Sequence, residues 1–279
     1  IFQTLSLPFI LLAGWLLTGL EANPGSLDLV IISAVILGLG FALLLGVFPF
    51  YTWIPLLAEE THPYIAGFIL WSFPTVGMFF GVSFLDRYSW LRETAALPSI
   101  LVTVGVLMIA TAGIFALFQR HLGRMMGYAV MLENGFSLLC LGLGGSFLDA
   151  FLLLFIPRLL GVALSALTLA NVQQFMPSLS LGELKNSGKA WSFSFLGFIL
   201  GVLSMAGLPL FAAFPLHQVI WVTLAQESLG SVIWLFVGCV GLMIASFRVM
   251  TVLVHGSTGE PWGSNETLLQ RFFILFAAF

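Results

Sequence analysis

Hydrophobic positions run in long stretches along most of the chain, and polar positions collect in the short segments between them. The stretches are continuous and do not alternate, which is typical of membrane-spanning helices and argues against the strands of a β-barrel. A helix needs about 20 apolar residues to cross the hydrocarbon core of a bilayer. The predicted spans are 4–20, 29–58, 64–85, 98–118, 125–145, 150–174, 191–226 and 231–252, with a further start at 268. This pattern predicts an all-α polytopic membrane protein.

Two of the predicted spans are too long for one straight crossing. Thirty residues of α-helix would extend about 45 Å, whereas the hydrocarbon core is about 30 Å thick. Proline inside a helix removes a backbone hydrogen bond and collides with the preceding turn. The residues predicted to break the long spans are Pro49 and Pro55 in 29–58, and Gly207, Pro209 and Pro215 in 191–226. Two discontinuous helices in the two halves of a chain are typical of inverted-repeat transporters, although proline kinks that only shape helix packing give the same pattern.

Composition agrees with a membrane location. Of the 279 residues 60% are hydrophobic and 8% are charged, with a mean hydropathy of +1.10, whereas soluble domains carry about 25% charged residues. The sequence has no basic cluster suited to nucleic acid. Cys140 and Cys239 lie far apart inside apolar spans and are interpreted as small core residues, not as a disulfide or a metal site. Because the chain begins at Ile1 inside one apolar run and stops at Phe279 inside another, we expect a longer parent protein.

Loop charges predict the orientation in the membrane. If successive spans alternate in direction, the basic residues fall into two groups on opposite sides. Arg120, Arg124, Lys185 and Lys189 lie on one side with Arg248 and Arg271 near it, and Arg87 and Arg92 lie on the other. By the positive-inside rule, the richer side faces the cytoplasm or its organellar equivalent. Two glycine clusters, GxxxG at Gly197 and Gly201 and GLGG at 142–145, indicate close helix packing.

Two charged residues lie inside predicted spans, near the middle of the membrane. Glu133 is eight residues into its span, and Arg158 is eight residues into the next span, which runs in the opposite direction. A charge at this depth is costly, so each residue requires a partner or a function. Either they form an ion pair that fixes two helices, or they lie on a polar axis for protons. In the second case Arg158 sets the electric field and does not carry the proton, because arginine stays charged.

Histidine and acidic residues beside the predicted breaks are further candidates. His217 follows the second break, and its imidazole can accept a proton on one nitrogen and release one from the other, although a lone histidine in a helix is often a packing residue. Glu59, Glu60 and His62 end the first broken span, and we expect them on the side opposite the cytoplasm or at its margin. They form either an interfacial polar loop or an entrance or exit for cations.

Three motifs resemble those of one family. The run from Phe48, FPFYTWIPLLAEETHP, resembles the PFHxWLPDAxxxxPTP signature of the antiporter-like subunits of respiratory complex I, which Mrp-type antiporters and membrane-bound hydrogenases share. Residues 118–135, FQRHLGRMMGYAVMLENG, resemble a second sequence motif of this family. Residues 204–217, SMAGLPLFAAFPLH, resemble a third motif of the same family. The family residues kept in the second motif are Gln119, Arg124, Tyr128 and Gly135. The order and spacing of the motifs agree over nearly the whole chain.

The resemblance implies an architecture. In that family two inverted five-helix repeats each contain a discontinuous helix, and a mid-membrane row of Lys, Glu and His residues conducts protons through water. The chain would then run from about the sixth helix of such a subunit to the start of about the fourteenth. Residues 1–119 would be the rest of the first repeat with the following linker helix, 120–255 the second repeat, and 256–279 a loop and the start of a further helix.

The chain departs from the family where the proton path is expected. A family lysine falls at Leu44, and the lysine or histidine of the next span falls near Val76. The family's basic cluster falls after Asp149, where this chain has only Arg158. The last residue of the family's row, a Lys or Glu, is replaced here by another titratable residue, His217. The hypothesis is therefore a membrane-arm subunit of a complex I-type redox-driven pump. It would contribute to proton translocation or, given the missing lysines, mainly to assembly of the arm.

The resemblance also implies partners and a location. We expect other membrane-arm subunits, lipids, and protons or sodium as partners, and a bacterial plasma membrane or an organellar inner membrane as the location. The chain would be a non-catalytic subunit of a translocase, with no cofactor, metal or redox site of its own and no nucleic-acid partner. The alternatives are a structural spacer that conducts nothing and a subunit of an Mrp-type cation/proton antiporter.

Overall fold

The computed structural model describes residues 2–22, 27–88, 96–145, 147–176, 178–185, 187, 190–254 and 266–278. Across these residues the regular secondary structure is helical, apart from one isolated bridge between His121 and Ser180. The helices are α1 (Phe2–Ala22), α2 (Leu27–Leu45), the 3-10 turn η1 (Phe50–Thr52), α3 (Trp53–Glu60), α4 (Pro63–Arg87), α6 (Ala96–Phe118), α7 (Leu122–Leu143), α8 (Phe147–Leu153), α9 (Phe155–Gln173), α10 (Ser192–Met205), α11 (Phe214–Glu227), α12 (Leu229–Val254) and α13 (Leu268–Ala278).

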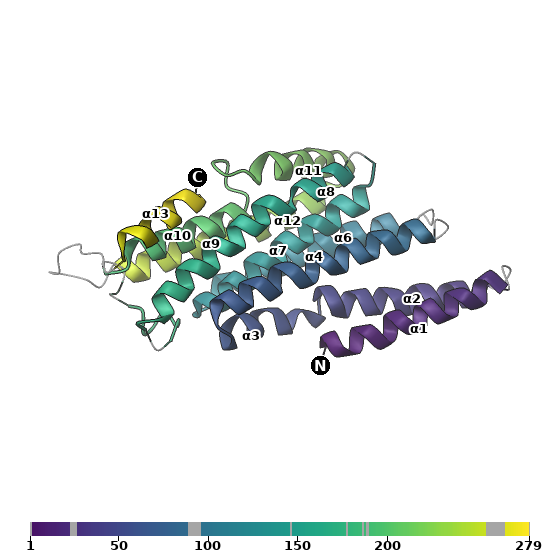
Figure 1. Ribbon diagram of the computed structural model, residues 1–279. Helices are drawn as coiled ribbons and strands as arrows, with labels where there is room; N and C mark the ends of the chain where they lie inside the picture. The colour runs from purple at the N-terminus through teal and green to yellow at the C-terminus, as the bar shows by residue number, and fades with distance from the viewer. Residues whose placement is uncertain are drawn as a thin grey trace.

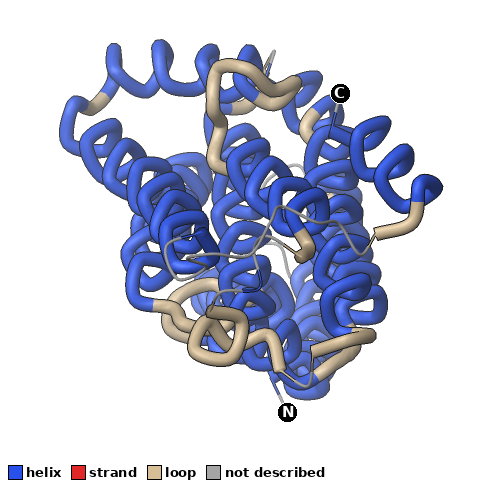
Figure 2. The backbone as a smooth tube through the Cα atoms, turned by 90° about the vertical axis from the view of Figure 1, so that its left-hand side faces the viewer, coloured by secondary structure: helices blue, strands red, loops and turns tan. Residues whose placement is uncertain are grey.

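The helices form a bundle of membrane-spanning length. Figure 1 shows the long helices running side by side in nearly the same direction, and Figure 2 views them almost end-on, joined by loops. Within the described residues, six spans are long and apolar enough to cross a bilayer: Leu29–Glu60, Pro63–Arg87, Ala96–Phe118, Leu122–Leu143, Phe147–Gln173 and Leu229–Val254. These correspond to stretches that the hydrophobic pattern predicted. The prediction of an all-α, multi-pass integral membrane protein is confirmed.

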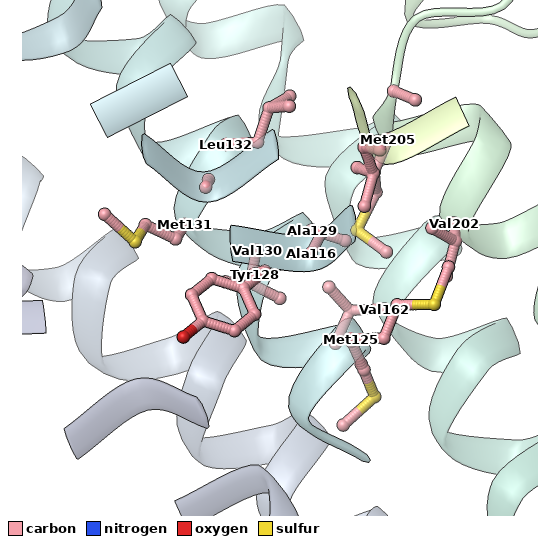
Figure 3. Close-up of a cluster of buried hydrophobic side chains, with 14 of the residues drawn as sticks. Ala116, Met125, Tyr128, Ala129, Val130, Met131, Leu132, Val162, Val202 and Met205 are labelled. Carbon is pink, nitrogen blue, oxygen red and sulfur yellow. The ribbon is translucent and has the colours of Figure 1, made fainter. Parts of the chain in front are cut away.

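Helix α7 lies at the centre of the bundle. It is the most buried of the six spans, with 89% of its apolar window enclosed, although its mean hydropathy is the lowest of the six. A helix enclosed by protein faces little lipid, so it can carry polar residues that a lipid-facing helix could not. Figure 3 shows Met125, Val162 and Met205 on one side of α7, and Tyr128 and Met131 on the other. Most of the other helices contact α7, whereas α1 packs on α2 and α13 packs on α9 and α10.

Glycines bring α6 close to both α12 and α7. Where α6 crosses α12, a Cβ atom added to Gly113 would collide with the backbone of Gly238, and one added to Gly238 would collide with the backbone of Ile109. Where α6 crosses α7, a Cβ atom on Gly105 or on Gly135 would lie 2.8 Å from the carbonyl oxygen of the other residue. Inside a bilayer, where apolar burial adds little, such close backbone contact is a main source of helix association.

The two predicted glycine clusters differ in their role. A Cβ atom on Gly197 or Gly201 would lie 2.7 Å or 2.5 Å from a side-chain atom of α9, so the prediction of close packing is confirmed there. In the GLGG cluster Gly142 packs against α6 in the same way. However, Gly144 and Gly145 have φ values of 63° and 54°, and an added Cβ atom meets nothing within 4 Å. They form the turn after α7, because a positive φ favours glycine, and the packing prediction is wrong for these two residues.

Both long spans contain a gap between two helices. Helix α2 ends at Leu45 and α3 begins at Trp53, and helix α10 ends at Met205 and α11 begins at Phe214. Of the predicted breaking residues, Pro49, Gly207 and Pro209 lie in the gaps, whereas Pro55 and Pro215 lie in the first turns of α3 and α11. Proline is tolerated in a first turn because the amide hydrogen that it lacks has no helical partner there. That these pairs are the discontinuous helices of two inverted repeats stays a prediction.

Substitution of Gly238 by Ala is expected to destabilise the bundle. The added methyl group would collide with the backbone of Ile109, and overpacking of this kind costs about 1 to 3 kcal/mol. We therefore expect a lower thermal unfolding midpoint for the purified protein. Gly38→Ala in α2 is the matched control, since an added Cβ atom there meets nothing within 4 Å and alanine favours a helix. Equal midpoints for the two variants would contradict the close crossing of α6 and α12.

Candidate functional site

Three ionisable side chains from three helices meet in the interior. Glu133 comes from α7, Arg158 from α9 and His217 from α11, and all three are almost fully buried. Glu133 Oε2 lies 3.9 Å from Arg158 Nε, and Glu133 Oε1 lies 3.6 Å from His217 Nε2. Both distances are too long for a hydrogen bond but short enough for a strong electrostatic interaction inside a protein. Together with Asn134 and Ser137 of α7, these residues form the central cluster.

Arg158 is fixed by hydrogen bonds to α7. Its NH1 group donates to Asn134 Oδ1 at 3.2 Å, and its NH2 group donates to the backbone oxygen of Glu133 at 2.8 Å and to Ser137 Oγ. The guanidinium also lies over the ring of Phe155, 5.3 Å from the ring centroid. Because the guanidinium donors form a rigid fork, these bonds determine both its position and its orientation. Arg158 therefore joins α9 to α7 and places a permanent positive charge beside Glu133.

The carboxylate of Glu133 is charge-paired but not hydrogen-bonded. Neither of its oxygens has a hydrogen-bond partner in the described part of the chain, although the side chain is only 1% exposed. The two ring nitrogens of His217 likewise have no hydrogen-bond partner there. Burial of polar groups without hydrogen bonds is costly, so such groups in a folded protein call for an explanation such as a catalytic role or a bound water. Two groups that can each bind a proton thus face one another.

The imidazole ring of His217 is held between Phe136 and Gly207. It stacks on the Phe136 ring, with centroids 3.8 Å apart and an angle of 11° between the planes. A Cβ atom on Gly207 would lie 2.5 Å from His217 Nδ1, and the φ of 77° at this position favours glycine. The first turn of α11 orients the residue, because the His217 amide donates to the carbonyl of Ala213 at 3.1 Å. Gly207, predicted only as a break, therefore also leaves room for the imidazole.

Three neighbours of the charged residues were not predicted from the sequence: Asn134, Phe136 and Ser137. Their spacing is a signal that could have identified two of them. Residues three and four positions after Glu133 lie on the same face of a helix, which places Phe136 and Ser137 beside its side chain. Polar residues inside an apolar span often hydrogen-bond across to another helix, as Asn134 and Ser137 do here.

The acidic residues at the end of α3 lie at one end of the bundle, outside the central cluster. Arg124 Nε donates to Glu59 Oε2 at 2.6 Å, whereas Glu60 and His62 are exposed. Arg124 belongs to the basic group that the charges predict to be cytoplasmic. The expectation that Glu59, Glu60 and His62 lie on the opposite side is therefore wrong. The reason is topological: α4 and α6 cross the membrane once each and return the chain to the side on which α3 ends.

Other contacts gather basic residues at the same end. The side chain of Arg248 donates to two backbone oxygens at the C-terminal end of α6, where the unpaired carbonyls of a helix attract cations. Burial lowers the pKa of nearby His121 below its ordinary value of 6.5, which Glu59 opposes and Arg124 reinforces. This end therefore carries several positive charges beside a histidine that favours its neutral form. Arg92 and Lys189, which also entered the orientation prediction, lie outside the described residues.

The part of the first half whose side chains the structure describes has no charged residue in its interior. Among residues 29–88 and 96–119, no Asp, Glu, Lys, Arg or His side chain is buried. Leu44 packs beside α4, where a Cβ atom on Gly77 would lie 2.9 Å from the Leu44 side chain. Val76 is 66% exposed and so lies on the outer surface. The buried charges known in this chain therefore belong to its second half.

Curated relatives belong to membrane complexes. No protein-family model matches the chain. The chloroplastic NAD(P)H-quinone oxidoreductase subunit 5 of Angiopteris evecta is 27% identical over 281 residues, which cover 90% of this chain and 35% of the relative. NADH-quinone oxidoreductase subunit N of Ectopseudomonas mendocina is 26% identical over 95% of this chain and 56% of the relative. A protein of Rhizobium meliloti named as a probable K⁺/H⁺ antiporter subunit is 32% identical over 44% of this chain and 23% of the relative. The chain thus spans only part of the length of these relatives.

Solved structures share the fold. The chain aligns over 99% of its length, with a TM-score of 0.85 and 18% identity, to 59% of a chain of the membrane-bound sulfane sulfur reductase, an archaeal respiratory membrane complex. It aligns with a TM-score of 0.83 and 13% identity to 62% of a chain of the Mrp complex from a Dietzia species. It also aligns to 63% of a chain of respiratory complex I from Thermus thermophilus, with a TM-score of 0.70 and 19% identity. The resemblance that the motifs indicated is confirmed: this chain is similar, in sequence and in fold, to the antiporter-like membrane subunits of complex I, Mrp antiporters and related respiratory complexes.

Proposed function

We propose that this chain is a membrane-arm subunit of a complex I-type redox-driven proton pump, and that its second half binds and releases a proton at Glu133 and His217. The observation that carries the proposal is the buried Glu133 carboxylate, 3.6 Å from His217 and 3.9 Å from Arg158, with no hydrogen bond to either carboxylate oxygen from the described residues. The relatives named as NADH-quinone oxidoreductase subunits support the assignment to such a complex.

The chemistry of the central cluster assigns each charged residue a separate role. Arg158 stays protonated and balances the negative charge of Glu133, so the pair carries no net charge. The imidazole of His217 can accept a proton on one nitrogen and release one from the other. A proton arriving at the cluster is attracted by the carboxylate and repelled by the guanidinium. Opposing interactions of this kind permit both uptake and release, which a relay requires.

The first half contributes structure in this proposal. By its resemblance to the antiporter-like family, it has Leu44 where the family carries a lysine, and no basic residue near Val76, where the family carries a lysine or histidine. We therefore assign proton transfer to 120–255 and packing of the arm to 1–119, with 256–279 as a loop and the start of a further helix. Neighbouring membrane subunits and lipids would cover the exposed apolar faces, and the redox chemistry would take place in other subunits.

Two alternatives each rest on a specific observation. A spacer that conducts nothing is favoured by the absence of a buried charge from residues 29–88 and 96–119. A subunit of a cation/proton antiporter is favoured by the relative named as a probable K⁺/H⁺ antiporter subunit and by the likeness to a chain of an Mrp complex. The two variants that follow separate conduction from a purely structural role.

His217→Ala is expected to impair pumping more than assembly. The substitution removes the imidazole that lies 3.6 Å from Glu133 Oε1, while Arg158 and its hydrogen bonds to α7 remain. Loss of a general acid–base group lowers a proton-transfer rate by about a hundredfold or more. We expect a large fall in proton translocation by vesicles that contain the complete complex. Gln218→Ala, at the next and exposed position of α11, is the matched control. Unchanged pumping by His217→Ala would favour the spacer.

Glu133→Gln tests whether the carboxylate acts mainly as an ion-pair partner. If it does, its loss leaves a buried arginine unpaired, which costs about 3 to 5 kcal/mol, and the subunit should fail to assemble. We expect a different outcome, because Arg158 keeps its bonds to the Glu133 carbonyl, Asn134 and Ser137. Assembly, measured as subunit content of the purified complex, should be largely kept while pumping falls. Glu60→Gln, which alters an exposed carboxylate, is the control. A loss of assembly with normal turnover per assembled complex would contradict the relay.

A further inference from the structure

The oxygen atoms of the central cluster resemble the ligand set of a metal cation. Five of them lie within two turns of α7: the backbone oxygen of Glu133, its two carboxylate oxygens, Asn134 Oδ1 and Ser137 Oγ. Hard cations take only oxygen ligands, and intramembrane sodium sites combine carbonyl oxygens with side-chain oxygens. The carboxylate of Glu133 also supplies one full negative charge inside a low-dielectric interior. By chemistry alone, α7 presents what a monovalent cation requires.

Arg158 already satisfies most of this oxygen set. Its guanidinium donates to the backbone oxygen of Glu133, to Asn134 Oδ1 and to Ser137 Oγ, and its Nε lies 3.9 Å from Glu133 Oε2. Glu133 Oε1 faces His217 Nε2 at 3.6 Å, and Ser137 Oγ also donates to the backbone oxygen of Glu133 at 3.3 Å. A sodium or potassium ion in this position would lack oxygen ligands and would meet a like charge at close range, where screening is weak. A proton needs only one basic atom, and Glu133 Oε1 and His217 Nε2 both offer one.

We propose that Arg158 takes the place of a monovalent metal cation on α7 and thereby restricts the central cluster to protons. This inference rests on the proposed function, because it names the ion that the same site transfers. It assigns Arg158 a specificity role in addition to its part in the electric field. It also argues against sodium or potassium as the ion bound at this site, although the chain has a relative named as a K⁺/H⁺ antiporter subunit.

The wild-type complex with its full-length subunit provides the first test. Sodium, potassium and choline chloride are exchanged at constant ionic strength, and the thermal unfolding midpoint and the pumping rate are measured. We expect any difference in unfolding midpoint or pumping rate between the three salts to be the same in the wild type and in Glu133→Gln. A saturable rise in the unfolding midpoint with sodium or potassium that Glu133→Gln abolishes would overturn the proposal, because a metal ion would then bind while Arg158 is present.

Arg158→Ala provides the second test, since it uncovers the oxygen atoms and removes the competing charge. We expect this variant to become cation-dependent: sodium or potassium at about ten times its dissociation constant should raise the unfolding midpoint by about 3 °C or more relative to choline. Millimolar guanidinium, far below the molar range that denatures proteins, should have a similar effect by replacing the lost side chain. Arg87→Ala, which alters an exposed arginine at the end of α4, should show neither effect.

The outcomes separate this proposal from the proposed function. An Arg158→Ala complex that responds to neither metal cations nor guanidinium would overturn the cation-mimic role, whatever its pumping rate. If Arg158→Ala cannot be purified, Arg158→Lys keeps the charge with fewer donors, and Glu133-dependent stabilisation of that variant or of the wild type by sodium would overturn the proposal. Pumping that does not depend on Glu133 or His217 would refute the proposed function and leave the cation-binding results valid.

Discussion

The hydrogen bonds between Arg158 and α7 are the interaction on which the interior of this protein depends. Burial of an isolated ion costs several kcal/mol even after relaxation, so neither Arg158 nor Glu133 could lie in the bundle alone. Arg158 satisfies its donors on a carbonyl, an amide and a hydroxyl of α7 and only approaches the carboxylate. The charge of Glu133 is thereby balanced while its oxygens stay available. This arrangement differs from a closed, bidentate salt bridge, which would occupy both carboxylate oxygens.

The packing of the bundle follows from the need to enclose this charged pair. Helix α7 carries Glu133 and the groups that bind Arg158 of α9, and 89% of its apolar window is enclosed by protein. Glycines at the crossings of α6 with α7 and with α12 let the helices around the pair pack closely. This packing does not rely on apolar burial, which adds little inside a bilayer. The turn at Gly207 then lets α11 begin beside the pair, with His217 against Phe136. Packing and the proposed proton chemistry therefore share the same residues.

Much of the architecture could be predicted from the sequence, because continuous apolar stretches have one simple solution in a membrane. That Glu133 and Arg158 lie at a similar level of the bundle followed from counting residues along helices of fixed rise, and the two side chains do meet. The prediction for Glu59 is wrong, because α4 and α6 each cross the bundle once between Glu59 and Arg124 and so bring the two residues to the same end. The partners Asn134 and Ser137 were missed because side-chain hydrogen bonds depend on the rotation of two helices about their axes, which periodicity determines poorly in helices that are apolar all round. Contacts such as that of Gly207 with His217 depend on loop conformation and could not be derived from spacing.

Infrared difference spectroscopy of the complete complex tests most directly whether Glu133 exchanges a proton during turnover. The spectrum of the working pump minus that of the resting pump contains bands from every carboxyl group that changes its protonation or its hydrogen bonding. We predict one such band that is absent in Glu133→Gln and shifted in His217→Ala, because the two groups face each other at 3.6 Å. A carboxyl region that is the same in the wild type and in Glu133→Gln would show that Glu133 keeps one state throughout turnover, and would contradict a proton relay at this site.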